Sequence, residues 1–224
     1  MIRVLKGLEP KKISVKNLET LLGVFTVIIT DKFVQEDIEF INFLLKSDDT
    51  IFLNVICSGY SGSPFEPSCP TPSEVKKAIQ YLLAKGFPAS NLMLTISPVI
   101  RNQKGIQKTK ELLNLFVDSG VYKIRVNQLI QSSQQRLQMH KKFGRNIVED
   151  CNKYQIEELQ NLYPNFKFYY CTQEDASCSA CVPPNLVHQL YGCVGTLRND
   201  RICSSLTMST IQLTKMDECL YYYR

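Results

Sequence analysis

Nearly continuous apolar runs recur along the chain, and each is short enough to form one buried strand. The runs are GVFTVIIT (23–30), TIFLNVICS (50–58), NLMLTISPVI (91–100), VYKIRVNQLI (121–130) and FKFYYC (166–171). They are rich in β-branched residues and mostly lack the polar alternation of a half-exposed strand, which favours a parallel sheet buried on both faces. We expect five parallel strands near 24–30, 50–57, 92–97, 122–127 and 167–171.

Amphipathic segments separate these runs. They are QEDIEFINFLLK (35–46), a segment from Pro72 to about Lys85, GIQKTKELLNLFVDSG (105–120) and residues 132–164. Thr71, Pro72 and Glu74 have the spacing of a capping box with proline at the first helical position. Gly86 and Gly120 follow the second and third segments, where glycine ends helices. We therefore expect a helix in each segment.

Strand and helix alternate, which predicts βαβ units and an α/β fold. Polar or special residues follow each strand: Asp31-Lys32, Ser58 to Ser63, Ser97-Pro98 with Arg101, Asn127-Gln128 and the cysteine loop. Ligands bind at this edge in barrels and in open α/β sheets alike. Between these two arrangements we favour a parallel (βα) partial TIM-like barrel with a Cys-rich C-terminal segment. The expected units are a basic leader (1–22), the partial barrel (23–171) and a Cys-rich segment packed on it (172–224).

The net charge of +5 is modest, but basic residues cluster in 1–16, 101–110 and 136–145. These clusters are either solvated helix faces or a phosphate-facing rim that binds nucleic acid or nucleotide. The sequence contains no run of about 18 apolar residues, so it predicts no membrane span. No signal-peptide pattern is seen, so we expect a cytoplasmic or other reducing compartment. The tyrosines in MDECLYYYR favour docking onto a protein partner.

Four of the nine cysteines gather in one stretch, with the spacing C-x6-C-x2-C-x11-C: Cys171, Cys178, Cys181 and Cys193. Disulfides are disfavoured in a reducing compartment, and Pro183-Pro184 stand where a redox-active C-x-x-C would begin a helix. Three alternatives stay open: a metal site, unligated buried thiols, and a redox or disulfide role, which is the least favoured. We favour metal, because C-x-x-C lets two thiolates hold one ion and two further thiolates complete a tetrahedron. Cys57, Cys69 and Cys151 are interpreted as small apolar core residues.

The stretch FLNVICSGYSGSPFEPSCPTPSEVKKAIQYLLAKGFPASNLMLTISPVI, with the later KFYYC and GC, resembles an uncharacterised group of radical S-adenosylmethionine (SAM) proteins related to spore photoproduct lyase. The resemblance implies a partial (βα) barrel that binds an iron–sulfur cluster and SAM at the carboxyl ends of its strands. It places Gly59, Tyr60 and Glu66 with Pro67 in the loop, Pro98 at the next strand end, and Cys171 and Cys193 among the late cysteines. The chain departs from the pattern in having no C-x3-C-x2-C triplet.

Two functions follow. The first is a radical-SAM-type enzyme with an unusual cluster on Cys171, Cys178 and Cys181, and with Arg101 and Arg125 near a nucleotide or nucleic-acid substrate. The second is a non-catalytic subunit that keeps the barrel, binds zinc and serves in assembly. An iron–sulfur protein would be brown after anaerobic purification, whereas a zinc protein would be colourless.

Overall fold

The computed structural model describes residues 2–23, 25–63, 66–100, 103–128, 137, 141, 154–171, 203–207 and 212–215. Its strands are β1 (Ile2–Lys6), β2 (Phe25–Thr30), β3 (Ile51–Cys57), β4 (Leu92–Val99), β5 (Lys123–Gln128), β6 (Lys167–Cys171), β7 (Cys203–Thr207) and β8 (Gln212–Lys215). Its helices are α1 (Val15–Leu21), α2 (Ile38–Lys46), α3 (Pro72–Ala84), α4 (Gln103–Phe116) and α6 (Tyr154–Leu162), with short 3-10 turns at Pro10–Lys12 and Ala89–Asn91.

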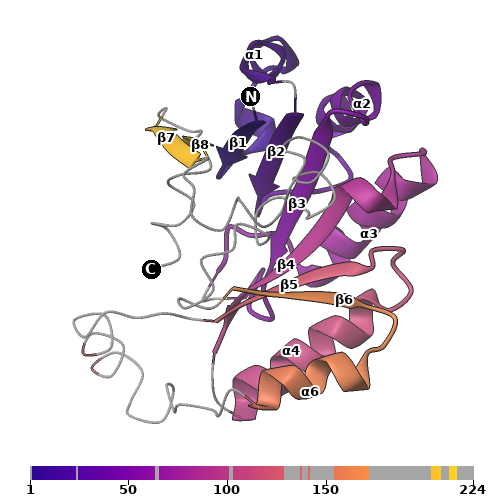
Figure 1. The fold of residues 1–224 in the computed structure, drawn as a ribbon, viewed down its shortest axis with the longest axis vertical. Helices are drawn as coiled ribbons and strands as arrows, with labels where there is room; N and C mark the ends of the chain where they lie inside the picture. The colour runs from indigo at the N-terminus through magenta and orange to yellow at the C-terminus, as the bar shows by residue number, and fades with distance from the viewer. Residues whose placement is uncertain are drawn as a thin grey trace, which may run out of the picture.

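All the strands belong to one sheet, in the order β6-β5-β4-β3-β2-β1-β8-β7. Strands β1 to β6 are parallel and neighbour one another in chain order. A doubly wound sheet reverses its strand order, and its helices cover both faces. With consecutive strand order and right-handed crossovers, the helices in the described residues lie on one face of the sheet, and the sheet curls around its opposite face. Figure 1 shows the helices along one side of the strands. The architecture is therefore a partial (βα) barrel, as the sequence predicted.

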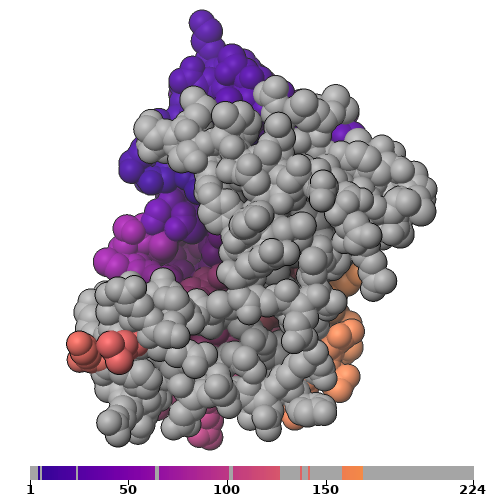
Figure 2. Space-filling model, turned by 60° about the vertical axis from the view of Figure 1, so that its left-hand side comes forward, coloured from indigo at the N-terminus to yellow at the C-terminus, as the bar shows by residue number. Residues whose placement is uncertain are grey.

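The five predicted strands are β2 to β6, and they are confirmed as parallel neighbours. The apolar pattern did not predict β1, which lies within the expected basic leader and pairs with β2 from Ile2↔Phe25 to Lys6↔Ile29. On the far side of β1, β8 pairs antiparallel with it, and β7 pairs antiparallel with β8. In the space-filling view, N-terminal residues (indigo) lie at the top and the region of α6 and β6 (orange) at the lower right (Figure 2).

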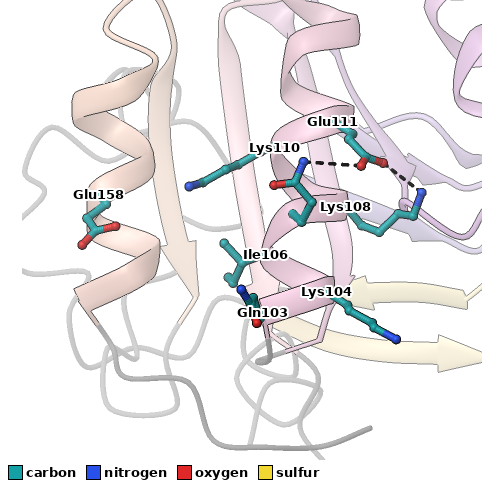
Figure 3. Close-up of a pocket in the computed structure, with 8 residues that line it drawn as sticks. Gln103, Lys104, Ile106, Lys108, Lys110, Glu111 and Glu158 are labelled. Carbon is teal, nitrogen blue, oxygen red and sulfur yellow. Dashed lines mark hydrogen bonds and ion pairs between the residues drawn. The ribbon is translucent and has the colours of Figure 1, made fainter.

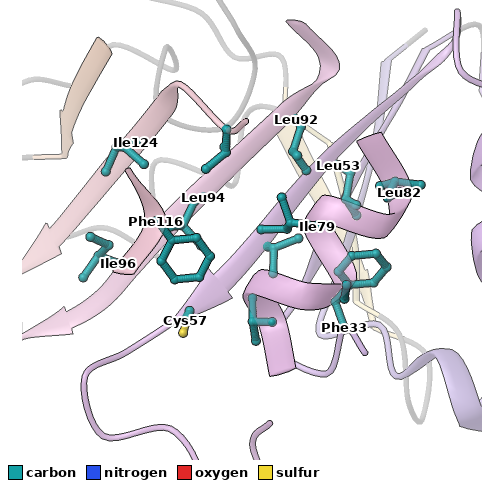
Figure 4. Packing of buried hydrophobic residues seen from close by; sticks show 14 of the residues in the cluster. Phe33, Leu53, Cys57, Ile79, Leu82, Leu92, Leu94, Ile96, Phe116 and Ile124 are labelled. Atoms are coloured by element: carbon teal, nitrogen blue, oxygen red, sulfur yellow. The ribbon is translucent and has the colours of Figure 1, made fainter. Parts of the chain in front are cut away.

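The main core fills the space between the sheet and the helices. Alternate residues of the strands, such as Leu53, Leu94 and Ile124, pack against helix residues that include Ile79 and Phe116 (Figure 4). Cys57 lies in this cluster at 1% exposure, and burial raises the pKa of its thiol to about 12. It is therefore the small core residue that the sequence predicted, and its thiol stays protonated at neutral pH.

Local signals placed the ends of α3 correctly. The Thr71 hydroxyl accepts a hydrogen bond from the Glu74 amide, and the Glu74 carboxylate accepts from the Thr71 amide at 2.7 Å, so the capping box forms in both directions. Gly86 follows the helix with φ of +103°, a conformation that glycine adopts without a Cβ penalty. Among the described helices, none is long and apolar enough to cross a bilayer.

Candidate functional site at the carboxyl edge of the sheet

The loop after β3 is held together by one carboxylate. Glu66 Oε2 accepts hydrogen bonds from Ser58 Oγ at 2.6 Å and Ser61 Oγ at 3.2 Å. The Ser61 hydroxyl accepts in turn from the Ser58 amide at 3.0 Å, and the Gly62 amide donates to the Glu66 carbonyl at 3.1 Å. The resemblance placed Glu66 among the ligand-binding residues, whereas the residues themselves favoured a loop cap. In the structure, Glu66 closes the loop that follows the strand.

Gly59 and Tyr60, also expected in the site, lie where this loop meets α4. A Cβ placed on Gly59 would lie 3.0 Å from the Cβ of Lys108, so the loop backbone approaches the helix closely. Burial raises the pKa of the Tyr60 hydroxyl, and the nearby Lys108 ammonium acts in the opposite direction. Both residues thus lie on the side of the loop that faces the helix layer.

The other expected cofactor-binding residues divide between the edge and the interior of the sheet. Pro98 lies in β4, where the pairing with β5 shifts register between Ile96 and Val99. Arg125 lies within β5 and is 1% exposed, opposite Thr95 of β4 in register. Arg101 lies outside the described residues.

The four expected metal ligands are placed only in part. Cys171 ends β6 opposite Asn127 of β5, which puts its backbone at the carboxyl edge of the sheet. Cys178, Cys181 and Cys193 lie outside the described residues. Within the described part of the chain, no three His, Cys, Asp or Glu residues come together in a metal-binding group. The cysteine site therefore stays a prediction.

A cavity of about 810 Å³ opens at the carboxyl ends of β1 to β3. We call it the edge cavity. Its wall is made by the loop after β1, the end of β2 and the far end of the loop after β3. The lining residues are Gly7, Glu9, Pro10, Lys11, Lys12, Asp31, Lys32, Val34, Ser68, Cys69, Pro70 and Glu74.

Lys32 joins two walls of the edge cavity. Its ammonium donates to the Ser68 carbonyl at 2.8 Å and the Ser68 hydroxyl at 3.1 Å, and it lies 3.4 Å from the Cys69 sulfur. The Asp31 carboxylate lies 3.8 Å from the same ammonium. In the loop after β1, which forms another wall of the cavity, the Lys12 ammonium lies 2.8 Å from the Glu9 carboxylate. Charges of both signs thus line one hollow.

The interpretation of Cys69 as an apolar core residue is wrong. Its thiol is half-buried, lies 3.7 Å from the Asp31 carboxylate and contacts the Lys32 ammonium. Partial burial raises the pKa of the thiol, and the Lys32 hydrogen bond opposes that rise. The sequence had singled out Asp31-Lys32 as a polar strand end, but nothing local indicated that the loop 36 residues later would close over it.

A second hollow, of about 630 Å³, lies on the helix layer between α4 and α6. We call it the α4–α6 groove. Its lining residues are Gln103, Lys104, Ile106, Gln107, Lys108, Lys110, Glu111 and Glu158. Lys108 pairs with Glu111 at 2.8 Å, whereas Lys104 and Lys110 form no ion pair with any acidic residue in the described ranges (Figure 3). Three members of the basic cluster 101–110 therefore line this groove: Lys104, Lys108 and Lys110.

Comparisons with known proteins identify no family for this chain. No protein-family model matches it, and no curated protein matches it. Two crystal structures of Streptococcus suis SuiB, one of them bound to S-adenosylmethionine, resemble it with a TM-score of 0.48 and 11% sequence identity. The alignment covers 75% of this chain and 38% of SuiB, so the chain spans well under half the length of that protein. The strand order described above establishes the fold, and the proposed relationship to spore photoproduct lyase stays a prediction.

Proposed function

We propose that this chain is a ligand-binding (βα) barrel that holds a zwitterionic, nucleoside-bearing small molecule of the S-adenosylmethionine class in the edge cavity. The observation that carries the proposal is the position and charge of that cavity. It lies at the carboxyl ends of parallel strands, where barrels bind their ligands. Its volume of about 810 Å³ falls in the range of small-molecule sites.

The charges that line the edge cavity favour a zwitterion over a polyphosphate. Three lysines, Lys11, Lys12 and Lys32, are balanced by three carboxylates, Glu9, Asp31 and Glu74. A polyphosphate is best held by a net positive site, whereas an amino-acid group needs a cation for its carboxylate and an anion for its ammonium. Lys32 and Asp31 offer this combination side by side, 3.8 Å apart.

The proposal includes a metal at the same edge. Cys171 ends β6 at the edge where the ligand would bind, and Cys178, Cys181 and Cys193 follow it in the sequence. An iron–sulfur cluster on these thiolates would supply radical chemistry when SAM is bound, and zinc would serve as a structural ion. An enzyme and a non-catalytic subunit are therefore distinguished by which metal the four cysteines hold.

Lys32→Met tests the edge cavity. The substitution removes a charge-assisted donor while keeping an unbranched side chain, so SAM affinity measured by calorimetry should fall by roughly tenfold or more. Lys46→Met is the matched control, because Lys46 is exposed in the last turn of α2, at the opposite edge of the sheet. Equal SAM affinity in wild type and Lys32→Met, or no SAM binding by the wild type at millimolar concentration, would overturn the proposal.

The α4–α6 groove supports a second function, binding of a nucleic-acid backbone. Lys104 and Lys110 line the groove without an acidic partner among the described residues. Replacing both with alanine should weaken binding of single-stranded nucleic acid and lower the slope of log K against log salt by about 1.4, since each phosphate contact contributes about 0.7. Lys46→Ala with Lys77→Ala removes the same charge elsewhere and should leave the slope unchanged. An unchanged slope in the groove variant would show that its lysines are solvated surface charges.

A further inference from the structure

The face of the sheet that points away from the helices carries a buried polar group. Strand side chains alternate between faces, so Val27, Ile29, Phe52 and Met93 are buried but lie outside the core that packs on the helices. The same face carries Asn54 of β3, Thr95 of β4, and Lys123 and Arg125 of β5. This inner face is the concave side of the partial barrel. Asn54, Thr95 and Arg125 lie in the middle of their strands, and Lys123 lies at the amino end of β5.

Asn54 is the clearest sign of a ligand at this face. The Thr95 hydroxyl donates to Asn54 Oδ1 at 2.6 Å, and both residues are 1% exposed. The Asn54 Nδ2 group is buried and has no hydrogen-bond partner in the part of the chain that the structure describes. Burying an amide donor without an acceptor costs about 1–3 kcal/mol, so such groups are few in folded proteins, and each requires an explanation.

The next strand adds buried positive charge to the same face. Lys123 and Arg125 stand two residues apart on β5, with exposures of 4% and 1%. The Lys123 ammonium donates to the Ser90 carbonyl and lies 5.6 Å from the centre of the Phe52 ring. Burial lowers the pKa of Lys123, and Lys167 beside it lowers the pKa further. The positive charge of these two side chains favours an anionic over a cationic ligand at this face.

We propose that the inner face binds the carboxylate end of a small organic acid, with Asn54 Nδ2 and the Arg125 guanidinium as donors. A guanidinium presents two parallel N–H groups that match the two oxygens of a carboxylate. Phe52 and Met93 are the apolar residues of this face on β3 and β4, and they would contact the hydrocarbon part of the ligand. This site is separate from the edge cavity, and it stands whether or not that cavity binds SAM.

Benzoate tests the inference, because it joins a carboxylate to an apolar ring. The full chain, labelled with ¹⁵N at asparagine side chains, is titrated with benzoate and followed by NMR. The Asn54 side-chain resonance should shift and saturate. Asn54→Leu should weaken benzoate binding by roughly tenfold to a hundredfold, because it removes a hydrogen bond to a charged group. Asn42→Leu, at an exposed position of α2, is the matched control and should bind like the wild type.

The titration of the wild-type protein decides the matter even if Asn54→Leu does not fold. An Asn54 resonance that stays unmoved by benzoate at 50-fold excess over protein would overturn the proposal. Tighter binding of inorganic phosphate than of benzoate would overturn the carboxylate assignment. SAM affinity should be unchanged in Asn54→Leu, so failure of the inner-face site and failure of the edge-cavity proposal are separate results.

Discussion

Gly105→Ala should destabilise the protein by about 2 kcal/mol or more, although alanine normally stabilises a helix relative to glycine. Gly105 is buried in the first turn of α4, close to Ile100, which directly follows β4. A Cβ at this position would lie 2.8 Å from the carbonyl carbon of Ile100 and still nearer to its oxygen. These are backbone atoms, so the contact is relieved only if the helix or the strand end moves.

Moving α4 would disturb the main core, since Leu113 and Phe116 of this helix are fully buried in it. The expected overpacking therefore exceeds the roughly 1 kcal/mol that alanine adds to helix propensity. Urea unfolding followed by circular dichroism measures the change. Gln107→Ala, at an exposed position of the same helix, should stay within about 0.5 kcal/mol of the wild type. A Gly105→Ala protein as stable as the wild type would contradict the close approach of Ile100 to α4.

Cys178→Ser should release the metal from the predicted four-cysteine site. Three thiolates, with zinc–sulfur bonds of about 2.3 Å, leave the fourth corner of the tetrahedron to solvent, so the ion is held less tightly. Metal-binding free energy also acts as folding free energy for the segment that supplies the ligands. The sheet should survive, because β6 is anchored to β5 from Lys123↔Lys167 to Asn127↔Cys171. Elemental analysis should show about one metal per chain in the wild type, if the ion is zinc, and none in the variant.

The control for this change is Cys69→Ser, whose thiol lies in the edge cavity beside Lys32 and should not affect metal content. Limited proteolysis should give new cleavage confined to residues 172–192 in Cys178→Ser, and the same pattern in wild type treated with a chelator. Metal content that is equal in the two proteins, or absent from the wild type, would contradict the site. A brown wild-type protein after anaerobic purification would identify an iron–sulfur cluster.

The sequence predicted what local interactions control. The capping box of Thr71 and Glu74 spans three residues, and the ends of α3 follow from it. The apolar runs identified β2 to β6 because a strand buried on both faces needs apolar side chains at almost every position. The run IRVLK was missed as a strand because it is short and carries two charges, and only pairing with β2 and β8 on its two sides shows that it belongs to the sheet.

Tertiary structure decided the sites. Lys32 and Ser68 are 36 residues apart, and they meet because the carboxyl ends of parallel neighbours lie at one edge of the sheet. The same holds for Asn54 and Thr95, which are 41 residues apart and are joined by the pairing of β3 with β4. Residue type and the alternation of side chains between the two faces of a strand, both visible in the sequence, determined which side chains could bind a ligand. Strand order and register, which depend on long-range packing, determined which of them stand together.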